Sequence, residues 1–254
     1  MINKIELWIL SSLDSPKSRQ DLSEELDYTK STISRALGNL EQLNLVHKEK
    51  AGNQTIAKPV EAKCVEVFQS LNDSNPHVDF PDHLTDSMLT MLCYFSSETP
   101  STAAELTERT GHARATIYRN LRTLTNRAMA TKEHSQYKLR EEFSELHHFA
   151  YELRHHLHRV RIKRDVGGGT IVWESHNEFL VRTENSVEAP NYYRTSLDAF
   201  SEYGLQFFTT SAQYYFYATA IESLTPEDFA CHLLLIKNDS RHRKYVLLLI
   251  AKTE

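Results

Sequence analysis

The chain repeats part of its own sequence when it is shifted by 84 residues, and this repeat restricts the possible folds more than any other feature. Residues 30–43 align with residues 114–127 without a gap. The identical pairs include Pro16 with Pro100, Leu22 with Leu106, Ile33 with Ile117, Arg35 with Arg119, Leu37 with Leu121 and Leu40 with Leu124. Because the matches include both the start and the apolar face of a helical pattern, they predict a fold that is present twice.

Each copy has the pattern of a helix-turn-helix. Thr102 and Glu105 form the capping-box pattern that begins a helix, and Ser18 with Asp21 repeats it in the first copy. Residues 114–127 then carry apolar residues on one helical face and basic residues on the other. The apolar face consists of Ile117, Leu121 and Leu124, and the opposite side shows Arg114, Tyr118, Arg119 and Arg122. A capped helix, a short turn and a cationic second helix are typical of a motif that enters a DNA groove.

A predicted β-hairpin follows each helix-turn-helix. The sequence Ala51-Gly52-Asn53 predicts the turn of the first hairpin, and His134-Ser135-Gln136 predicts a shorter second one. Three helices followed by a two-stranded hairpin form a winged helix. We therefore expect one winged-helix domain at residues 1–71 and a second at residues 83–140, joined by a polar linker that contains proline.

The order and size of these elements, with the sequence T-I-S-R-A-L-G-N-L at residues 32–40, resemble winged-helix regulators of the MarR, ArsR and TrmB kind. The resemblance covers about the first 140 residues as two copies. It implies transcriptional control by insertion of the third helix into a DNA groove. The chain departs from these families at two places. A-G-N-Q stands at residues 51–54 instead of the charged wing motif of MarR proteins, and the metal-binding cysteines of the ArsR type are missing.

Charge is distributed unevenly along the chain, whose formal net charge is −5. Residues 1–108 carry 9 Lys and Arg against 17 Asp and Glu, and residues 165–254 carry 7 against 12. Residues 109–164 carry 13 against 5, a net charge of +8. Because the local field decides where a polyanion binds, this middle segment is the expected DNA-binding surface.

The residues expected to contact DNA lie near the N-terminal half of each third helix, which reaches the base edges. Arginine paired with guanine and asparagine with adenine each contribute about 1–3 kcal/mol of discrimination. The candidates are Arg114, Thr116, Tyr118, Arg119, Asn120, Arg122 and Lys132 in the second copy and Lys30, Ser31, Thr32, Ser34 and Arg35 in the first. The surroundings of the first copy are acidic, so it either binds DNA or packs as a degenerate repeat.

Residues 141–164 are predicted to form a long basic connecting helix without proline or glycine. Its apolar residues recur at spacings of 3 and 4, as in a coiled-coil seam. The seam consists of Phe143, Leu146, Ala150, Leu153, Leu157 and Val160. Two interpretations are equally supported: the helix packs on its own chain, or it pairs with a second copy to form a homodimer.

The same helix contains five histidines, His147, His148, His155, His156 and His158. No two of them are four residues apart, which is the spacing that would direct both rings to one metal ion. We therefore expect solvent-facing histidines near phosphate, with no metal and no cofactor.

The segment at residues 170–254 follows the flexible sequence Gly167-Gly168-Gly169 and is expected to be a small α/β domain for sensing or protein contact. The sequence T-P-E-D at residues 225–228 predicts a helix start, and it faintly resembles the C-terminal part of AbiEi-type antitoxins. Residues 205–209 are predicted to form a strand, and residues 245–251 either a strand or a helix. Aromatic residues could line a ligand pocket here, although core packing is favoured. They are Tyr192, Tyr193, Phe207, Phe208, Tyr214, Tyr215, Phe216 and Tyr217.

The sequence contains no motif of a hydrolase, metalloprotease or P-loop enzyme, so no catalytic residue is assigned and no enzyme is expected. Three isolated cysteines, no membrane-length apolar run and no signal-peptide core favour a cytoplasmic protein without a membrane partner. The expected fold is mainly α with α+β character. It comprises two tandem winged helix-turn-helix domains, the long helix and the C-terminal α/β domain.

The expected function is sequence-specific binding of double-stranded DNA by a transcriptional regulator. A protein or a small-molecule effector could act at the C-terminal domain. Two alternatives remain open. One is an antitoxin or adaptor that uses winged helices for protein contacts, and the other is a nuclease or nucleotidyl transferase in the C-terminal domain.

Overall fold

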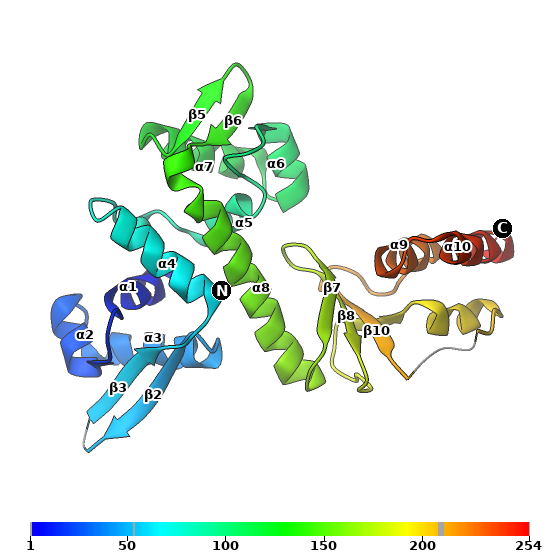
Figure 1. Cartoon of the computed structure of the whole chain (residues 1–254), viewed down its shortest axis with the longest axis horizontal. Helices are drawn as coiled ribbons and strands as arrows, with labels where there is room; N and C mark the ends of the chain where they lie inside the picture. Colours follow the sequence, from blue (N-terminus) through cyan, green and yellow to red (C-terminus); the bar gives the residue numbers. More distant parts are fainter. Residues whose placement is uncertain (1, 53, 208–210, 254) are drawn as a thin grey trace. The chain divides into compact units, whose positions relative to one another are not determined.

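The computed structural model describes residues 2–52, 54–207 and 211–253. The chain divides into two compact units, Met1–Leu157 and His158–Glu254. In the described residues, helices accompany three small antiparallel sheets (Figure 1). These elements confirm the mixed α+β fold class, with winged helices and a C-terminal α/β domain. None of the described helices is long and apolar enough to cross a membrane.

The first half of the first unit is a three-helix fold with a small sheet. Its helices are α1 (Lys4–Ser12), α2 (Arg19–Glu25) and α3 (Lys30–Gln42), and its strands are β1 (Lys17–Ser18), β2 (Val46–Ala51) and β3 (Gln54–Pro59). The strands pair in the order β1-β3-β2. The predicted turn falls between β2 and β3, with Gly52 at a φ of 61°, whereas Asn53 lies outside the described residues. Helix α4 (Lys63–Ser74) follows and extends into the segment predicted as a linker.

The second half has the same element order. After a short 3-10 helix, η1 (Phe80–Asp82), it consists of α5 (Asp86–Leu92), β4 (Ser101–Thr102), α6 (Ala103–Thr110), α7 (Arg114–Asn126), β5 (Ala130–Glu133) and β6 (Gln136–Leu139). The strands again pair with the third strand in the middle, in the order β4-β6-β5. The second hairpin is the shorter one, since it spans residues 130–139 against residues 46–59 in the first.

Unusual backbone conformations recur at positions 84 residues apart. The turn between the second and third helices contains Asp27 (φ 54°) in the first half and Gly111 (φ 67°) in the second. The second residue after the third helix is also left-handed in both halves, at Asn44 (φ 52°) and Ala128 (φ 55°). A left-handed residue commonly ends a helix, and for alanine it costs about 1–2 kcal/mol. The two halves therefore turn the chain in the same way at the same places.

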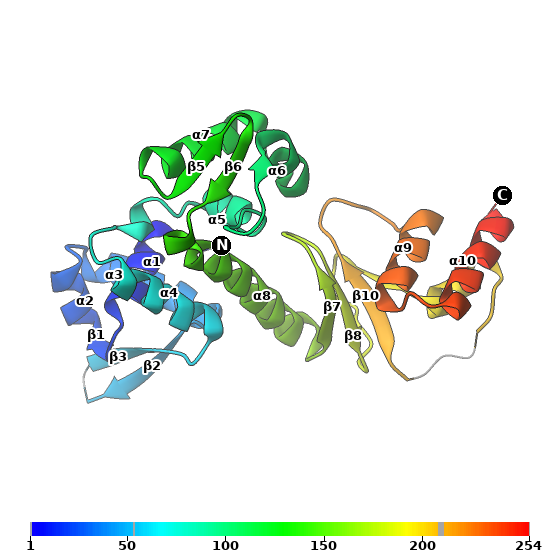
Figure 2. The same cartoon turned by 45° about the horizontal axis from the view of Figure 1, so that its top comes forward.

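The 3-10 helix η2 (Glu141–Phe143) precedes helix α8 (Glu145–Val166), which is drawn as one long helix in Figures 1 and 2. Helix α8 contributes side chains to the core of the first unit. Leu146, Ala150 and Leu153 are buried in the core cluster that also contains residues of both halves. The ring of Phe149 stacks on Phe68 of α4 with centroids 4.6 Å apart. Phe143 and Leu157 pack partly against the same cluster, and Val160 is half-buried. The central residues of the seam are therefore covered by their own chain, as in the first of the two interpretations, and pairing with a second copy stays a prediction.

The histidines of α8 are also placed differently from the prediction. The Nδ1 atom of His147 lies 2.7 Å from the carbonyl oxygen of Leu92 in the second half. The Nε2 atom of His156 lies 2.9 Å from the carbonyl oxygen of Leu43 in the first half. His158 is buried, with Nδ1 2.8 Å from a carboxylate oxygen of Glu174. These three rings are held by protein groups and do not form a solvent-facing row.

The second unit contains a four-stranded antiparallel sheet and two terminal helices. Its elements are β7 (Thr170–Glu174), β8 (Phe179–Thr183), β9 (Tyr192–Thr195), the 3-10 helix η3 (Leu197–Tyr203), β10 (Gln213–Tyr217), α9 (Pro226–Ile236) and α10 (Ser240–Thr253). The strand order is β7-β8-β10-β9. Residues 205–207 form no strand, and residues 208 and 209 lie outside the described residues. Residues 245–251 are helical, within α10.

The start of α9 follows the prediction from T-P-E-D. Thr225 accepts a hydrogen bond from the backbone N–H of Asp228, and the Asp228 carboxylate accepts one from the Thr225 N–H. Most of the aromatic side chains of β10 are buried, namely Tyr215, Phe216 and Tyr217. Tyr214 instead lines a pocket with Phe207, and Phe208 lies outside the described residues. Core packing therefore accounts for most of this aromatic cluster, but not for all of it.

Candidate nucleic-acid interface

Helix α7 is fixed by its apolar face. Ile117, Leu121 and Leu124 are buried, and the helix packs against α5 and α6. The opposite face carries exposed side chains, which are Arg114, Tyr118, Arg119 and Arg122. This division of the helix follows the 3.6-residue period of the sequence. The basic side chains therefore project from a helix whose other side is immobilised.

Arg114 and Tyr118 hold each other at the start of this face. An Nη atom of Arg114 donates to the Tyr118 hydroxyl at 3.3 Å, and the guanidinium lies 5.5 Å from the ring centroid. The hydrogen bond raises the pKa of Arg114 above its usual value. In the described part of the chain, no carboxylate forms an ion pair with Arg114, Arg119 or Arg122. Their charge is therefore available to an external anion.

Asn120 does not belong to this face, contrary to the prediction. Its side chain is only 4% exposed, and its amide donates to the Ser87 hydroxyl of α5 at 3.3 Å. A side chain buried in this way joins two helices and cannot reach a base edge. The internal repeat could have indicated that position 120 is buried, because Asn120 aligns with Ala36, an apolar residue that is also buried.

The remaining candidates of the second half lie beside α7. Thr116 is half-buried in the first turn of the helix. Lys132 is exposed on β5, with its ammonium nitrogen 5.4 Å from the centroid of the Tyr137 ring. The hairpin turns at His134, whose φ is 55°. Lys132 is thus held on the hairpin that follows α7.

The equivalent face in the first half is less basic. Lys30, Ser31, Ser34 and Arg35 are exposed on α3, and Lys30 donates to the Gln20 side chain at 3.4 Å. Thr32 is engaged in the helix cap, since its backbone N–H donates to the Thr29 hydroxyl.

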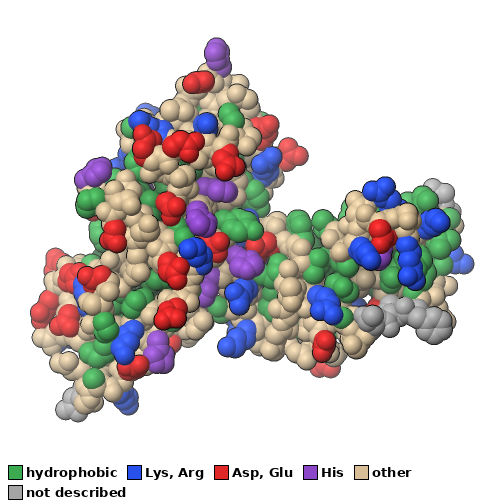
Figure 3. Space-filling model, in the orientation of Figure 1, with side chains coloured by type: hydrophobic (Ala, Val, Ile, Leu, Met, Phe, Trp, Pro, Cys, Tyr) green, Lys and Arg blue, Asp and Glu red, His purple; other side chains and the backbone are tan. Residues whose placement is uncertain are grey.

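Acidic side chains lie beside α3. They gather over the neighbouring helix α2 in Figure 3 and comprise the exposed residues Asp21, Glu24, Glu25 and Asp27. Like charges near a polyanion weaken its binding. The structure thus presents two faces of similar geometry but different charge.

Two segments of the chain match known protein families. Residues 7–48 are similar to the family described as "Bacterial regulatory protein, arsR family". This match runs from α1 through the helix-turn-helix of the first half and supports DNA-binding transcriptional regulation in general. Residues 189–254 match the family described as HVO_2833_C, C-terminal, which covers β9, β10, α9 and α10. No curated protein matches the chain. The AbiEi resemblance stays a prediction.

The arsR match raises the question of a metal site. Within the described residues, no group of three or more His, Cys, Asp or Glu side chains is arranged to hold a metal ion. Cys64 and Cys93 are buried and Cys231 is exposed. Burial raises the pKa of the Cys64 thiol to about 12, so this cysteine is a neutral core residue.

Proposed function

We propose that this chain is a sequence-specific DNA-binding transcriptional regulator whose principal groove contact is made by α7. The observation that carries the proposal is the exposed arginine face of α7, comprising Arg114, Arg119 and Arg122, which forms no ion pair with any described carboxylate and lies on a helix whose opposite side is buried. The arsR-family match supports the general function, although it covers the first helix-turn-helix. The distribution of charge favours the second helix-turn-helix as the principal DNA contact, since residues 109–164 carry a net charge of +8.

Binding would proceed through the two contributions that govern protein–DNA recognition. Phosphate contacts supply affinity and fix the register, and side chains near the start of α7 read base edges. If about six phosphates are neutralised, the affinity falls roughly a thousandfold between 50 and 200 mM salt. The Arg114–Tyr118 pair restricts one side chain before binding and so lowers the entropy cost of contact.

The two halves provide a matched experiment, because Arg35 and Arg119 occupy equivalent positions on α3 and α7. A duplex selected from a randomised pool by the full chain would be titrated with the Arg119→Ala, Arg122→Ala and Arg35→Ala variants. We expect each α7 substitution to weaken binding and, where the side chain contacts phosphate, to reduce the slope of log affinity against log salt by about 1. Arg35→Ala should have a smaller effect.

The control is Lys63→Ala, which removes one positive charge from α4 that is already paired with Glu66 at 3.4 Å. It should leave affinity unchanged. Equal losses in Lys63→Ala and Arg119→Ala would indicate a general charge effect and contradict the assignment. A larger loss in Arg35→Ala would transfer the principal contact to α3.

The duplex selection also tests the alternative in which the winged helices bind protein. If the chain selects no duplex at low salt, a winged-helix adaptor or antitoxin that binds protein explains the fold better.

We also propose that the chain binds DNA without catalysing a reaction on it. Labelled duplex incubated with the protein and Mg²⁺ should therefore stay intact, and cleavage or nucleotide addition would support an enzyme.

A further inference from the structure

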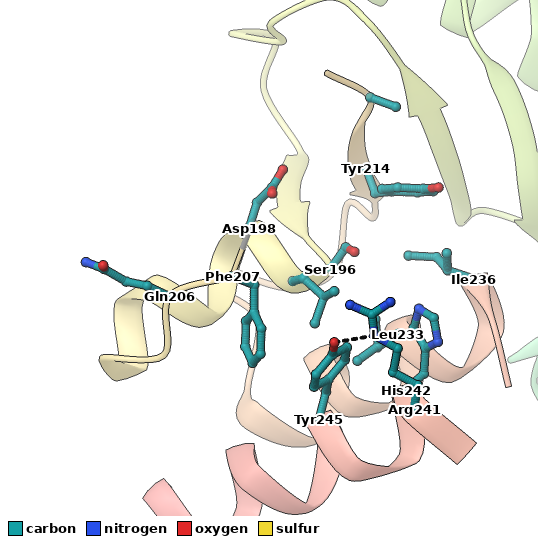
Figure 4. A pocket seen from close by; sticks show the side chains of 12 residues that line it. Ser196, Asp198, Gln206, Phe207, Tyr214, Leu233, Ile236, Arg241, His242 and Tyr245 are labelled. Carbon is teal, nitrogen blue, oxygen red and sulfur yellow. Dashed lines mark hydrogen bonds between the residues drawn. The ribbon is translucent and has the colours of Figure 1, made fainter. Parts of the chain in front are cut away.

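A pocket of about 460 Å³ opens in the second unit beside the start of α10 (Figure 4). Its volume falls within the range of roughly 300–1,000 Å³ that is typical of small-molecule sites. The apolar walls come from η3, the segment that follows it, and α9. They include Leu197, Phe207, Leu233 and Ile236. Polar groups reach the same space from β10 and α10.

Arg241, an exposed residue at the start of α10, brings a positive charge to this pocket. Its Nε atom donates to the Tyr245 hydroxyl at 2.5 Å, and the guanidinium lies 5.5 Å from the centroid of that ring. Figure 4 shows the guanidinium between Ser196 and Tyr245. Among the described residues, no carboxylate pairs with Arg241. The tyrosine therefore positions the guanidinium but does not neutralise its charge.

The acidic side chains nearby are engaged by other cations or donors. Asp198 accepts from Arg194 at 3.4 Å. Asp239 accepts from the backbone N–H of His242 at 2.8 Å and lies 2.6 Å from Nδ1 of that ring, and these contacts hold its pKa well below the usual range. Among the described residues neither carboxylate pairs with Arg241, which leaves its guanidinium accessible to an anion from outside the chain.

The rest of the lining indicates what kind of anion fits. The Phe207 and Tyr245 rings pack with centroids 4.6 Å apart, and Leu233 is buried behind them. A guanidinium can bind either a carboxylate or a phosphate through two parallel N–H···O bonds, but its single positive charge neutralises a carboxylate and only half of a phosphate dianion. The apolar wall matches a ring or a branched hydrocarbon.

We propose that this pocket binds a small monocarboxylate with an apolar, ring-sized body, held through its carboxylate by Arg241 and through its body by Phe207, Leu233 and Ile236. The backbone of Ser196, at φ 76° and ψ −169°, is a second sign of a ligand site, because strained residues cluster where ligands bind. This assignment does not depend on whether the chain binds DNA.

Isothermal titration of the full chain with three probes tests the assignment. Benzoate should bind saturably. Benzamide, which has the same ring without the charge, and inorganic phosphate, which has charge without the ring, should bind at least about tenfold more weakly. Equal affinity for benzoate and benzamide would overturn the role of the charge. Tighter binding of phosphate, or no binding of benzoate, would overturn the ligand class.

A matched pair of variants locates the site. Arg241→Gln should reduce the benzoate affinity to the benzamide level. Arg243→Gln should not, because Arg243 lies on the same helix, does not line the pocket and donates to Asn238 at 2.8 Å. Equal loss in both variants would contradict the assignment. If Arg241→Gln fails to fold, as its melting curve would show, the comparison of benzoate with benzamide on the unsubstituted protein decides the question.

Discussion

Ser196 adopts a backbone conformation that glycine alone adopts easily. Its φ of 76° and ψ of −169° place it where a side chain costs about 1–3 kcal/mol. We expect Ser196→Gly to raise the free energy of unfolding by about 1 kcal/mol, since the relief of strain exceeds the extra chain entropy of glycine. Urea denaturation would measure the difference. A destabilised variant would show that the serine side chain contributes more than its backbone costs.

Asn120 illustrates a residue whose role depends on one hydrogen bond inside the fold. We expect Asn120→Ala to lower the free energy of unfolding by about 1 kcal/mol, because the bond to Ser87 is lost in a buried position. DNA affinity should not change once the variant is folded. Normal stability together with an altered base preference in this variant would instead show that Asn120 contacts DNA.

Whether a single residue is buried or exposed was predictable from the sequence where the 3.6-residue helical period determines the side of the helix on which it lies. The exposed arginines of α7 follow from the spacing of Ile117, Leu121 and Leu124. Asn120 sits next to Leu121 at the edge of that face, where the period alone does not separate inside from outside. Arg241 gave no sequence signal, because its pocket brings together side chains from several elements that are distant along the chain.

At the scale of an element, the helix starts were the most predictable feature. In the second half, the Thr102 hydroxyl accepts from the Glu105 N–H at 3.2 Å, and the Glu105 carboxylate accepts from the Thr102 N–H at 2.7 Å. We expect Thr102→Ala to cost about 1 kcal/mol of stability, as for other N-cap substitutions. Ser18→Ala tests the equivalent cap of α2. A negligible effect at both sites would mean that tertiary packing alone sets these helix starts.

Glu105 makes part of this stability dependent on pH. Its hydrogen bonds from Thr102 hold the pKa of the carboxyl below its ordinary value of 4.5. Because the folded-state pKa is the lower one, the contribution is present above 4.5 and is lost as the pH falls through the folded value. The difference in melting temperature between the wild type and Glu105→Gln should therefore shrink on acidification. A constant difference would contradict this.

Helix α8 shows what an element's sequence leaves undecided. The spacing of Leu146, Ala150 and Leu153 predicts an apolar seam, and the structure has one. The chemistry of such a seam is the same whether the covering surface belongs to the same chain or to another. The three-dimensional structure shows which surface covers the seam: α4 and the cores of both halves of the first unit pack on this side of α8.

At the scale of the whole molecule, the two winged helices share a core. One buried cluster extends from Ile2 to Leu153 and includes residues of both halves and of α8. The domain expected at residues 83–140 lacks α8, so an isolated fragment would expose the surface that Leu146 and Phe149 cover. We expect a fragment of residues 1–157 to give the dispersed NMR spectrum of a folded protein and a fragment of residues 83–140 to give a collapsed one. A folded short fragment would contradict the shared core.

The burial of the α8 seam inside its own chain has a consequence for how a binding site on DNA could evolve. In a homodimer, one codon specifies both recognition helices, so every substitution acts twice and the operator tends towards a palindrome. Here α3 and α7 are encoded separately within one polypeptide. Each can change without the other, so under the proposed function a single chain would be able to match two unrelated half-sites.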